Sequence, residues 1–328
     1  MNSRVPRRTS LLLARLARAL DRQLPAAIAG DDKGVHHARV ASRRLREAVP
    51  VLATGLPGHH GAKARRKIRR LTCALGTVRE LDVTLSILDE LAHSETSFRT
   101  AVEDVRTYVV AERDGRRTEM LHRLERVDAA KLGRRLASVS AALKEAVDEP
   151  WRKALSARLL TRGRRLGAAI DAAGHLYDPE RLHAVRVAAK KLRYGLELAA
   201  DSGTRQAAPL VRQIKKAQDM LGRLHDLQVL LTHVAAVQAA PHPGRTHHRE
   251  ALDLLAHHVE EQCRHLHGRY VASAPRLRLL PATIRKSVVP QLAYPSRRGR
   301  SVKMVRMTLK KTPKPAGSIP PRAASGGR

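Results

Sequence analysis

The chain has 328 residues, enough for one large domain or two of ordinary size. Lysine and arginine number 63 against 30 aspartate and glutamate residues, which gives a formal net charge of +33. This charge implies an anionic partner: nucleic acid, an acidic membrane surface or a phosphate polymer. Aromatic residues make up only 2% of the chain, which argues against single-stranded nucleic acid, whose bases usually stack on aromatic rings. No segment approaches the roughly 20 apolar residues of a membrane span.

Up to about residue 272 the sequence predicts an all-α fold. Alanine, leucine, arginine and glutamate dominate, apolar residues recur at spacings of three and four, and no segment alternates as a strand would. In the first half we expect a helix up to Gly30, and a second helix capped by Asp31 or Asp32. The expected helices of this half are 9–29, 31–54, 62–92, 96–126 and 127–147.

The second half begins after Glu149-Pro150. Asp178 followed by Pro179 is typical of a helix start, with a capping residue and a proline in the first turn. The expected helices of this half are 151–173, 179–203, 205–239 and 246–271. Both halves, about 9–147 and about 149–272, therefore have the same order of elements.

A basic stripe occupies one face of the second expected helix. In the segment HHARVASRRLR a histidine is followed by basic residues at +3, +7 and +10, namely His36, Arg39, Arg43 and Arg46. On a helix these four positions fall within about 80° of one another, and apolar residues occupy the opposite face. One face is thus predicted to enter a core while the other presents positive charge.

The same stripe recurs in the second half. The segment HAVRVAAKKLR carries His183, Arg186, Lys190 and Arg193 at the same spacings. A single basic stripe is usually a solvated helix face. Its repetition at matching positions favours a functional surface instead.

A second pair of matching segments supports an internal duplication. LGTVRELDV at 75–83 matches LGRLHDLQV at 221–229, with an offset of 146 residues against 147 at the stripes. The halves thus differ by a single-residue gap between these motifs. We therefore expect two related up-and-down helical bundles that meet about a pseudo-two-fold axis.

The expected helix after each stripe carries a further basic face. If these helices neighbour the stripes, four cationic faces converge where the halves meet, forming a groove that would focus its field on an extended polyanion. The residues of this second face are Arg66, Arg69 and Arg70 in the first half and Arg212, Lys215 and Lys216 in the second.

The two repeated histidines have three possible roles. His36 and His183 could donate to a phosphate oxygen, or could orient a neighbouring side chain or cap a carbonyl. Metal binding is least favoured, because no carboxylate or second histidine recurs at ligand spacing in both copies.

Glu80 and Asp226 occupy matching positions among the cations. We expect each to pair with an arginine and fix its rotamer rather than to perform acid–base catalysis. No P-loop, nucleophile elbow or paired-carboxylate pattern occurs. The sequence therefore indicates no catalytic residue, no cofactor and no metal site.

From residue 275 onward the composition changes. The segment 275–328 holds 14 lysine or arginine residues, no acid, and many proline, glycine and serine residues. It is predicted to be a disordered basic tail. The rest of the chain, with 49 basic and 30 acidic residues, is cationic in its own right.

The two ordered motif pairs, HxxRVAxxxLR with LGxxRELDV and HxxRVAxKKLRY with LGxLHDLQV, resemble the CHAD domain (conserved histidine α-helical domain) over residues 9–272. The resemblance implies two four-helix bundles that bind inorganic polyphosphate on a basic surface between them, often on polyphosphate granules. Carried over by position, the contacts would be His36, Arg39, Arg43 and Arg46 with His183, Arg186, Lys190 and Arg193, extended by the basic residues of the following helices.

The chain departs from the family pattern in two respects. Nothing in it resembles the triphosphate-processing CYTH domain that is fused to some relatives, so the resemblance implies no hydrolase activity. The second copy has His225 and Gln228 where the first has Arg79 and Asp82, so the halves are expected to contribute unequally.

The resulting hypothesis is a non-enzymatic, cytoplasmic polyphosphate-binding protein, associated with polyphosphate granules. The main alternative is a nucleic-acid-binding or general polyanion-binding protein, with nucleic acid held by the tail. An enzyme of phosphate metabolism is disfavoured because metal-binding carboxylates are lacking.

Overall fold

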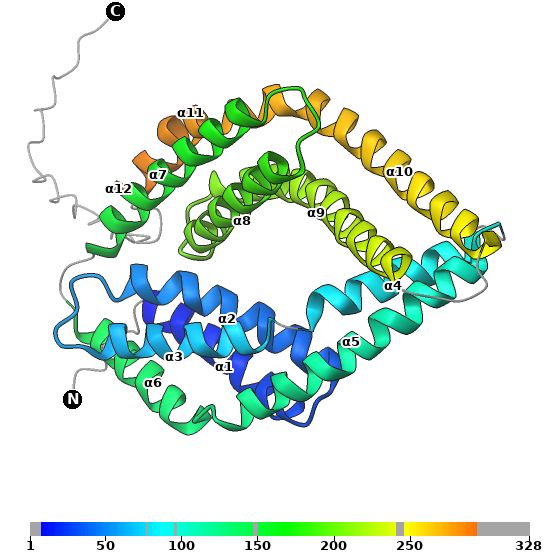
Figure 1. Ribbon diagram of the computed structural model, residues 1–328. Coiled ribbons are helices and arrows are strands. Elements are labelled where there is room, and N and C mark those ends of the chain that lie inside the picture. Colours follow the sequence, from blue (N-terminus) through cyan, green and yellow to red (C-terminus); the bar gives the residue numbers. More distant parts are fainter. Residues whose placement is uncertain (1–7, 77, 95–96, 147–149, 241–245, 294–328) are drawn as a thin grey trace, which may run out of the picture. The chain divides into compact units, whose positions relative to one another are not determined.

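The structure is a computed structural model that describes residues 8–76, 78–94, 97–146, 150–240 and 246–293. These residues form helices joined by turns, with no strand among them (Figure 1), which confirms the all-α prediction. The helices of the first half are α1 (Arg8–Ile28), α2 (Asp32–Leu52), α3 (His60–Ala74), α4 (Arg79–Ser94), α5 (Arg99–Glu125) and α6 (Ala129–Glu145).

The second half has fewer and longer helices. They are α7 (Pro150–Ala173), α8 (Pro179–Asp201), α9 (Ala207–Ala239) and α10 (Thr246–Arg278). The chain continues through α11 (Leu280–Thr283), the π-helix η1 (Ile284–Val288) and α12 (Val289–Ala293).

In the first half, four helices pack in a closed order: α1 on α2, α2 on α3, α3 on α6, and α6 on α1. Leucines such as Leu20 and Leu45 are fully buried in this group. The turn before α2 forms as predicted, because Gly30 takes a positive φ of 81° and the Asp31 carboxylate accepts from the Gly34 amide at 2.5 Å. The stripe helix α2 therefore begins at a position fixed by its own sequence.

In the second half, α7 packs on α8, α8 on α9, α9 on α10, and α10 on α7. The predicted start of α8 is confirmed: Asp178 Oδ1 accepts from the amides of Glu180 and Arg181 at 3.0 and 3.1 Å. Pro179 occupies the first turn, where its missing N–H costs no hydrogen bond.

The single long helix predicted over 62–92 is wrong, because the chain breaks between α3 and α4. At the break Arg39 Nη1 donates to the carbonyls of Leu75 and Gly76 at 3.3 and 2.9 Å, so these acceptors are satisfied by a side chain of α2. A Cβ on Gly76 would lie 3.3 Å from that guanidinium. In the second half, α9 runs unbroken through the matching positions.

The break lets α4 and α5 leave the first group of helices. The two pack on each other, both contact α9, and α5 also contacts α10 (Figure 1). Helices of the first half therefore pack directly on those of the second half.

The prediction that the folded body ends near residue 272 is also wrong. Helix α10 continues to Arg278, and α11, η1 and α12 all pack on α7. Apolar residues at spacings of three and four bury this segment despite its basic composition: Leu277, Leu280, Ile284, Val288 and Leu292. The predicted disordered tail is thus contradicted for 275–293, whereas 294–328 lies outside the described residues.

The packing of 280–293 can be tested at Ile284, whose side chain is fully buried. Ile284→Ala is expected to lower the free energy of unfolding by about 2–5 kcal/mol, the usual cost of emptying a well-packed aliphatic site. Chemical denaturation would measure the change. Exposed Arg285 offers the control, since Arg285→Ala should stay within about 0.5 kcal/mol of the parent. Equal effects of the two substitutions would contradict the packing.

Candidate functional site

The two stripe helices pack against each other, α2 from the first half and α8 from the second. Four half-buried cations lie at this contact, and we call them the cationic cluster: Arg39 and Arg43 of α2, Arg186 and Lys190 of α8. The Lys190 ammonium interacts electrostatically with the other three, and Arg43 also acts on Arg186. The structure thus brings the centres of both stripes together.

Crowding and burial change the proton affinity of the cluster. Burial, reinforced by the charges of Arg186, Arg43, Arg39 and Arg193, lowers the pKa of Lys190 to about 7. Burial, with the charges of Arg43 and Arg79, likewise lowers the pKa of Arg39 to about 10. Lys190 therefore titrates near neutral pH, and a bound anion would favour its charged form.

Two carboxylates lie beside the cluster. Asp226 of α9 approaches Arg186 at 3.8 Å, which confirms the expected pairing with an arginine. Glu80 of α4 instead pairs with a histidine, because its Oε1 lies 3.5 Å from Nε2 of His225 on α9. The hydrogen bond from His225 lowers the pKa of Glu80, whereas burial raises that of Asp226.

The repeated histidines lie at the start of each stripe, and both are exposed. His183 contacts His225, with 3.4 Å between their Nδ1 atoms and 4.7 Å between ring centroids. His36 lies within electrostatic range of Arg79, the residue that matches His225. Burial lowers the pKa of both His36 and His183, and nearby positive charges lower it further.

The outer stripe residues Arg46 and Arg193 are half-buried. Arg193 Nε lies 3.4 Å from Glu197 Oε1, and its guanidinium lies 5.2 Å from the Tyr194 ring centroid. The predicted second basic face is exposed on α3 (Arg66, Arg69, Arg70) and on α9 (Arg212, Lys215, Lys216). The charges that shift the pKa values of Arg39, Arg186 and Lys190 come from α2, α4, α8 and α9 and include none of these six.

Sequence reasoning did not assign a role to Arg79 or Tyr194, both of which act on Arg39. Arg79 could have been found, since it belongs to the duplicated LGxxRELDV segment. Tyr194 directly follows the stripe, but nothing in the spacing singles it out.

A buried ion pair joins the two halves beside the stripes. Arg162 of α7 donates from Nη2 to Glu47 Oε2 of α2 and from Nη1 to the Lys191 carbonyl of α8, both at 2.6 Å. The side chains of Arg162 and Glu47 are only 10% and 13% exposed, so the pair excludes most water. We call this the Glu47–Arg162 clamp. It fixes α2 to the helix pair that carries the second stripe.

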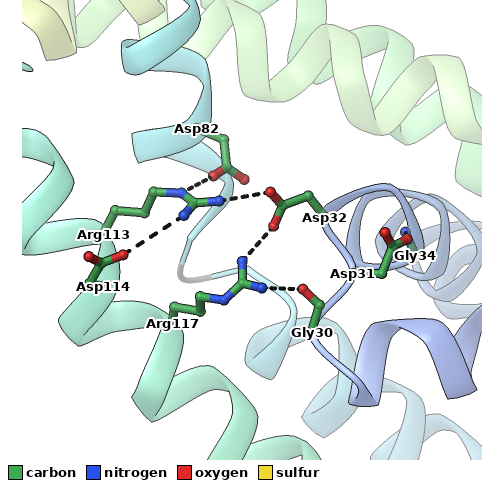
Figure 2. A network of polar contacts seen from close by, with 8 residues as sticks. All are labelled: Gly30, Asp31, Asp32, Gly34, Asp82, Arg113, Asp114 and Arg117. Atoms are coloured by element: carbon green, nitrogen blue, oxygen red, sulfur yellow. Dashed lines mark hydrogen bonds and ion pairs between the residues drawn. The ribbon is translucent and has the colours of Figure 1, made fainter.

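A second network holds the start of α2 (Figure 2). Arg113 of α5 contacts Asp82 at 2.7 Å and Asp32 at 2.9 Å, while Arg117 contacts Asp32 at 2.6 Å and donates to the Gly30 carbonyl. Asp32 begins the helix that carries His36, and Asp82 lies one turn from Arg79. The network therefore holds together the start of α2, which carries His36, and the first turn of α4, which carries Arg79.

Two features of the described ranges bear on other functions. No three histidine, cysteine, aspartate or glutamate residues within them are grouped to hold a metal ion. None of their helices combines the length and apolarity needed to cross a membrane.

Comparison with known proteins gives a family and a fold. The family model described as "CHAD domain" matches residues 11–235. The structure of PptA from Streptomyces chartreusis is similar with a TM-score of 0.59 at 16% identity, covering 83% of this chain and 100% of that chain. The crystal structure of the CHAD domain from the plant Ricinus communis has a TM-score of 0.57 at 19% identity, covering 84% and 90%. No curated protein matches the chain.

The cost of a charge on Lys190, from burial and from repulsion by neighbouring cations, should be measurable as a loss of stability. The pKa of Lys190 is depressed in the folded protein from 10.5 to about 7, so stability rises with pH across this interval. Lys190→Met keeps an apolar stem and removes the charge. It is expected to raise the melting temperature of the unliganded protein by a few degrees at pH 6 and by less at pH 9.

Lys191→Met, at an exposed neighbour, is the control and should leave the melting temperature nearly unchanged at both pH values. A Lys190→Met protein that is no more stable than the parent at pH 6, or equally stabilised at pH 9, would contradict the assigned cost of burying a charge on Lys190 among other cations.

Proposed function

Because the chain belongs to the CHAD domain family, we propose that it binds inorganic polyphosphate and catalyses no reaction on it. The observation that carries the proposal is the cationic cluster, in which half-buried cations from both halves lie together. An extended polyanion carries closely spaced negative charge along its length. A surface that supplies cations from two helices matches such a ligand in charge.

The chemistry of the cluster suits phosphate oxygens. Arginine offers a planar fork that binds two oxygens, and lysine offers a mobile point charge. Lys190 has no carboxylate among the groups that shift its pKa, so a phosphate would supply the counter-charge. We expect direct contacts from the four cluster residues.

The remaining predicted contacts extend this surface. His36, Arg46, His183 and Arg193 flank the cluster along α2 and α8. The exposed cations of α3 and α9 would add a longer-range field that attracts the polymer. Such steering weakens with salt, as does any binding through many phosphates.

The carboxylates near the cluster support a binding role. Asp226 pairs with Arg186 and Glu80 pairs with His225, so both are engaged in orienting other side chains. The halves would offer related surfaces if they arose by duplication as two pseudo-symmetric four-helix bundles. The parallel order of α1–α2–α3 and α7–α8–α9 supports that origin.

In the cell, the proposed ligand would concentrate the protein on polyphosphate granules. Nucleic acid is the competing polyanion, because duplex DNA and RNA also present closely spaced phosphates. A protein that recognises polyphosphate by its site, and not by charge alone, should prefer it over either nucleic acid.

Charge reversal within the cluster tests the proposal. Arg43→Glu combined with Lys190→Glu is expected to weaken binding of long-chain polyphosphate by on the order of 100-fold, because acids would replace two cations facing the polymer. The slope of log affinity against log salt should also fall by about 1.4, about 0.7 for each lost contact. Fluorescence anisotropy with labelled polyphosphate would measure both quantities.

The two substitutions relieve repulsion between cations, so the helical circular dichroism should persist. The matched control is Arg18→Glu with Lys191→Glu, an equal charge change at exposed positions of α1 and α8. It should lose affinity only severalfold. Equal losses of affinity in the two double variants would mean that binding depends on net charge alone, and would contradict the proposal.

A further inference from the structure

Three titratable side chains form a chain of contacts across the two halves. Glu80 of α4 lies 3.5 Å from Nε2 of His225, and Nδ1 of His225 lies 3.4 Å from Nδ1 of His183. His183 is the histidine of the second stripe, whereas His225 and Glu80 come from the two matching LG segments. His225 therefore links a carboxylate of the first half to a stripe residue of the second half.

Hydrogen-bond logic assigns the protons in this chain. Glu80 accepts from His225, so Nε2 of His225 carries a proton. If both rings are neutral, Nδ1 of His225 is an acceptor and Nδ1 of His183 is the donor. Nε2 of His183 then carries a lone pair, which would repel a phosphate oxygen.

One added proton changes what His183 can offer. Placed on Nε2 of His183, it turns that nitrogen into a donor for a phosphate oxygen and leaves both existing contacts intact. A second proton would put hydrogens on both Nδ1 atoms and break the contact between the rings. The pair thus accommodates a single proton.

The first half lacks this property. At the position that matches His225 it has Arg79, a permanent cation, which acts on His36. The second half thus has His225 where the first half has Arg79. The binding proposal does not explain this difference between the two repeats.

We propose that the second half of the site binds its polyanion together with one proton, which the His183–His225 pair takes up and Glu80 orients. This inference rests on the proposed function and concerns its regulation. Acidification would tighten binding, because His183 becomes a phosphate donor only in the protonated pair.

The surroundings of His183 disfavour a positive charge on its ring. Partial burial lowers the pKa of His183 most, the charges of His225, Arg186 and Lys190 lower it further, and Glu80 of α4 raises it. Asp226 of α9 faces Arg186, and Arg223 of α9 faces Glu90 of α4 at 2.6 Å.

Charged groups on the other packed helices contact residues other than His183. On α2, Arg39 donates to the Leu75 and Gly76 carbonyls and Arg43 lies in the cationic cluster, and on α7, Arg162 holds Glu47. On α10, Glu260 faces Arg264 at 3.6 Å, and on α5, Glu112 faces His233 at 3.7 Å. The anion itself would therefore supply the charge that favours protonation.

The test is the number of protons taken up on binding long-chain polyphosphate, from titration calorimetry in buffers of different ionisation enthalpy. All proteins carry Lys190→Arg, which removes a cluster residue whose pKa is about 7. His225→Arg copies the first half and should reduce uptake at pH 6.5 by at least about half a proton. The pH dependence of log affinity should flatten by the same amount.

His183→Gln, at an exposed position, should lower proton uptake by a similar amount. It tests the same pair at a second residue, in case His225→Arg fails to fold. His265→Arg, at an exposed site on α10, is the matched control and should leave uptake unchanged. Protons taken up by His36 or by the ends of the polymer are common to all four proteins, so they cancel when the proton uptake of the variants is compared. Equal uptake by all four proteins, with binding retained, would overturn the proton coupling alone. Absence of polyphosphate binding in the wild-type chain would overturn the proposed function and this inference with it.

Discussion

The constraint on which the site depends is the packing of two like-charged helix faces against each other. Where α2 meets α8, Arg39 and Arg43 lie close to Arg186 and Lys190, and burial removes much of the water that would screen them. Such an arrangement opposes folding. It persists because the apolar faces of both helices are buried and because the Glu47–Arg162 clamp ties them together.

This balance explains why the cluster is suited to an anion. The unliganded protein keeps cations near one another at a cost in free energy, and a polyanion would offset that cost on binding. Three carboxylates near the cluster already have partners: Glu47 forms the clamp, Asp226 faces Arg186, and Glu80 faces His225. The cluster therefore keeps an excess of positive charge for its ligand.

The sequence predicted the features that depend on neighbouring residues. The starts of α2 and α8 followed from Asp31 and Asp178, and both stripes followed from helical spacing within eleven residues. The break after Leu75 did not, because it depends on a guanidinium 36 residues away. The clamp was also missed, since its partners are 115 residues apart and have no local signature. Residues 280–293 were assigned to the tail because composition outweighed the apolar spacing.

The most direct test of the proposed binding is competition between polyanions for the 328-residue chain. Labelled long-chain polyphosphate would be bound at physiological salt and challenged with duplex DNA and with RNA at equal phosphate concentration. We expect that neither nucleic acid displaces the polymer, because the proposed site would recognise an extended polyphosphate and not charge alone. Displacement by either at equal phosphate concentration would show a general polyanion binder and contradict the central claim.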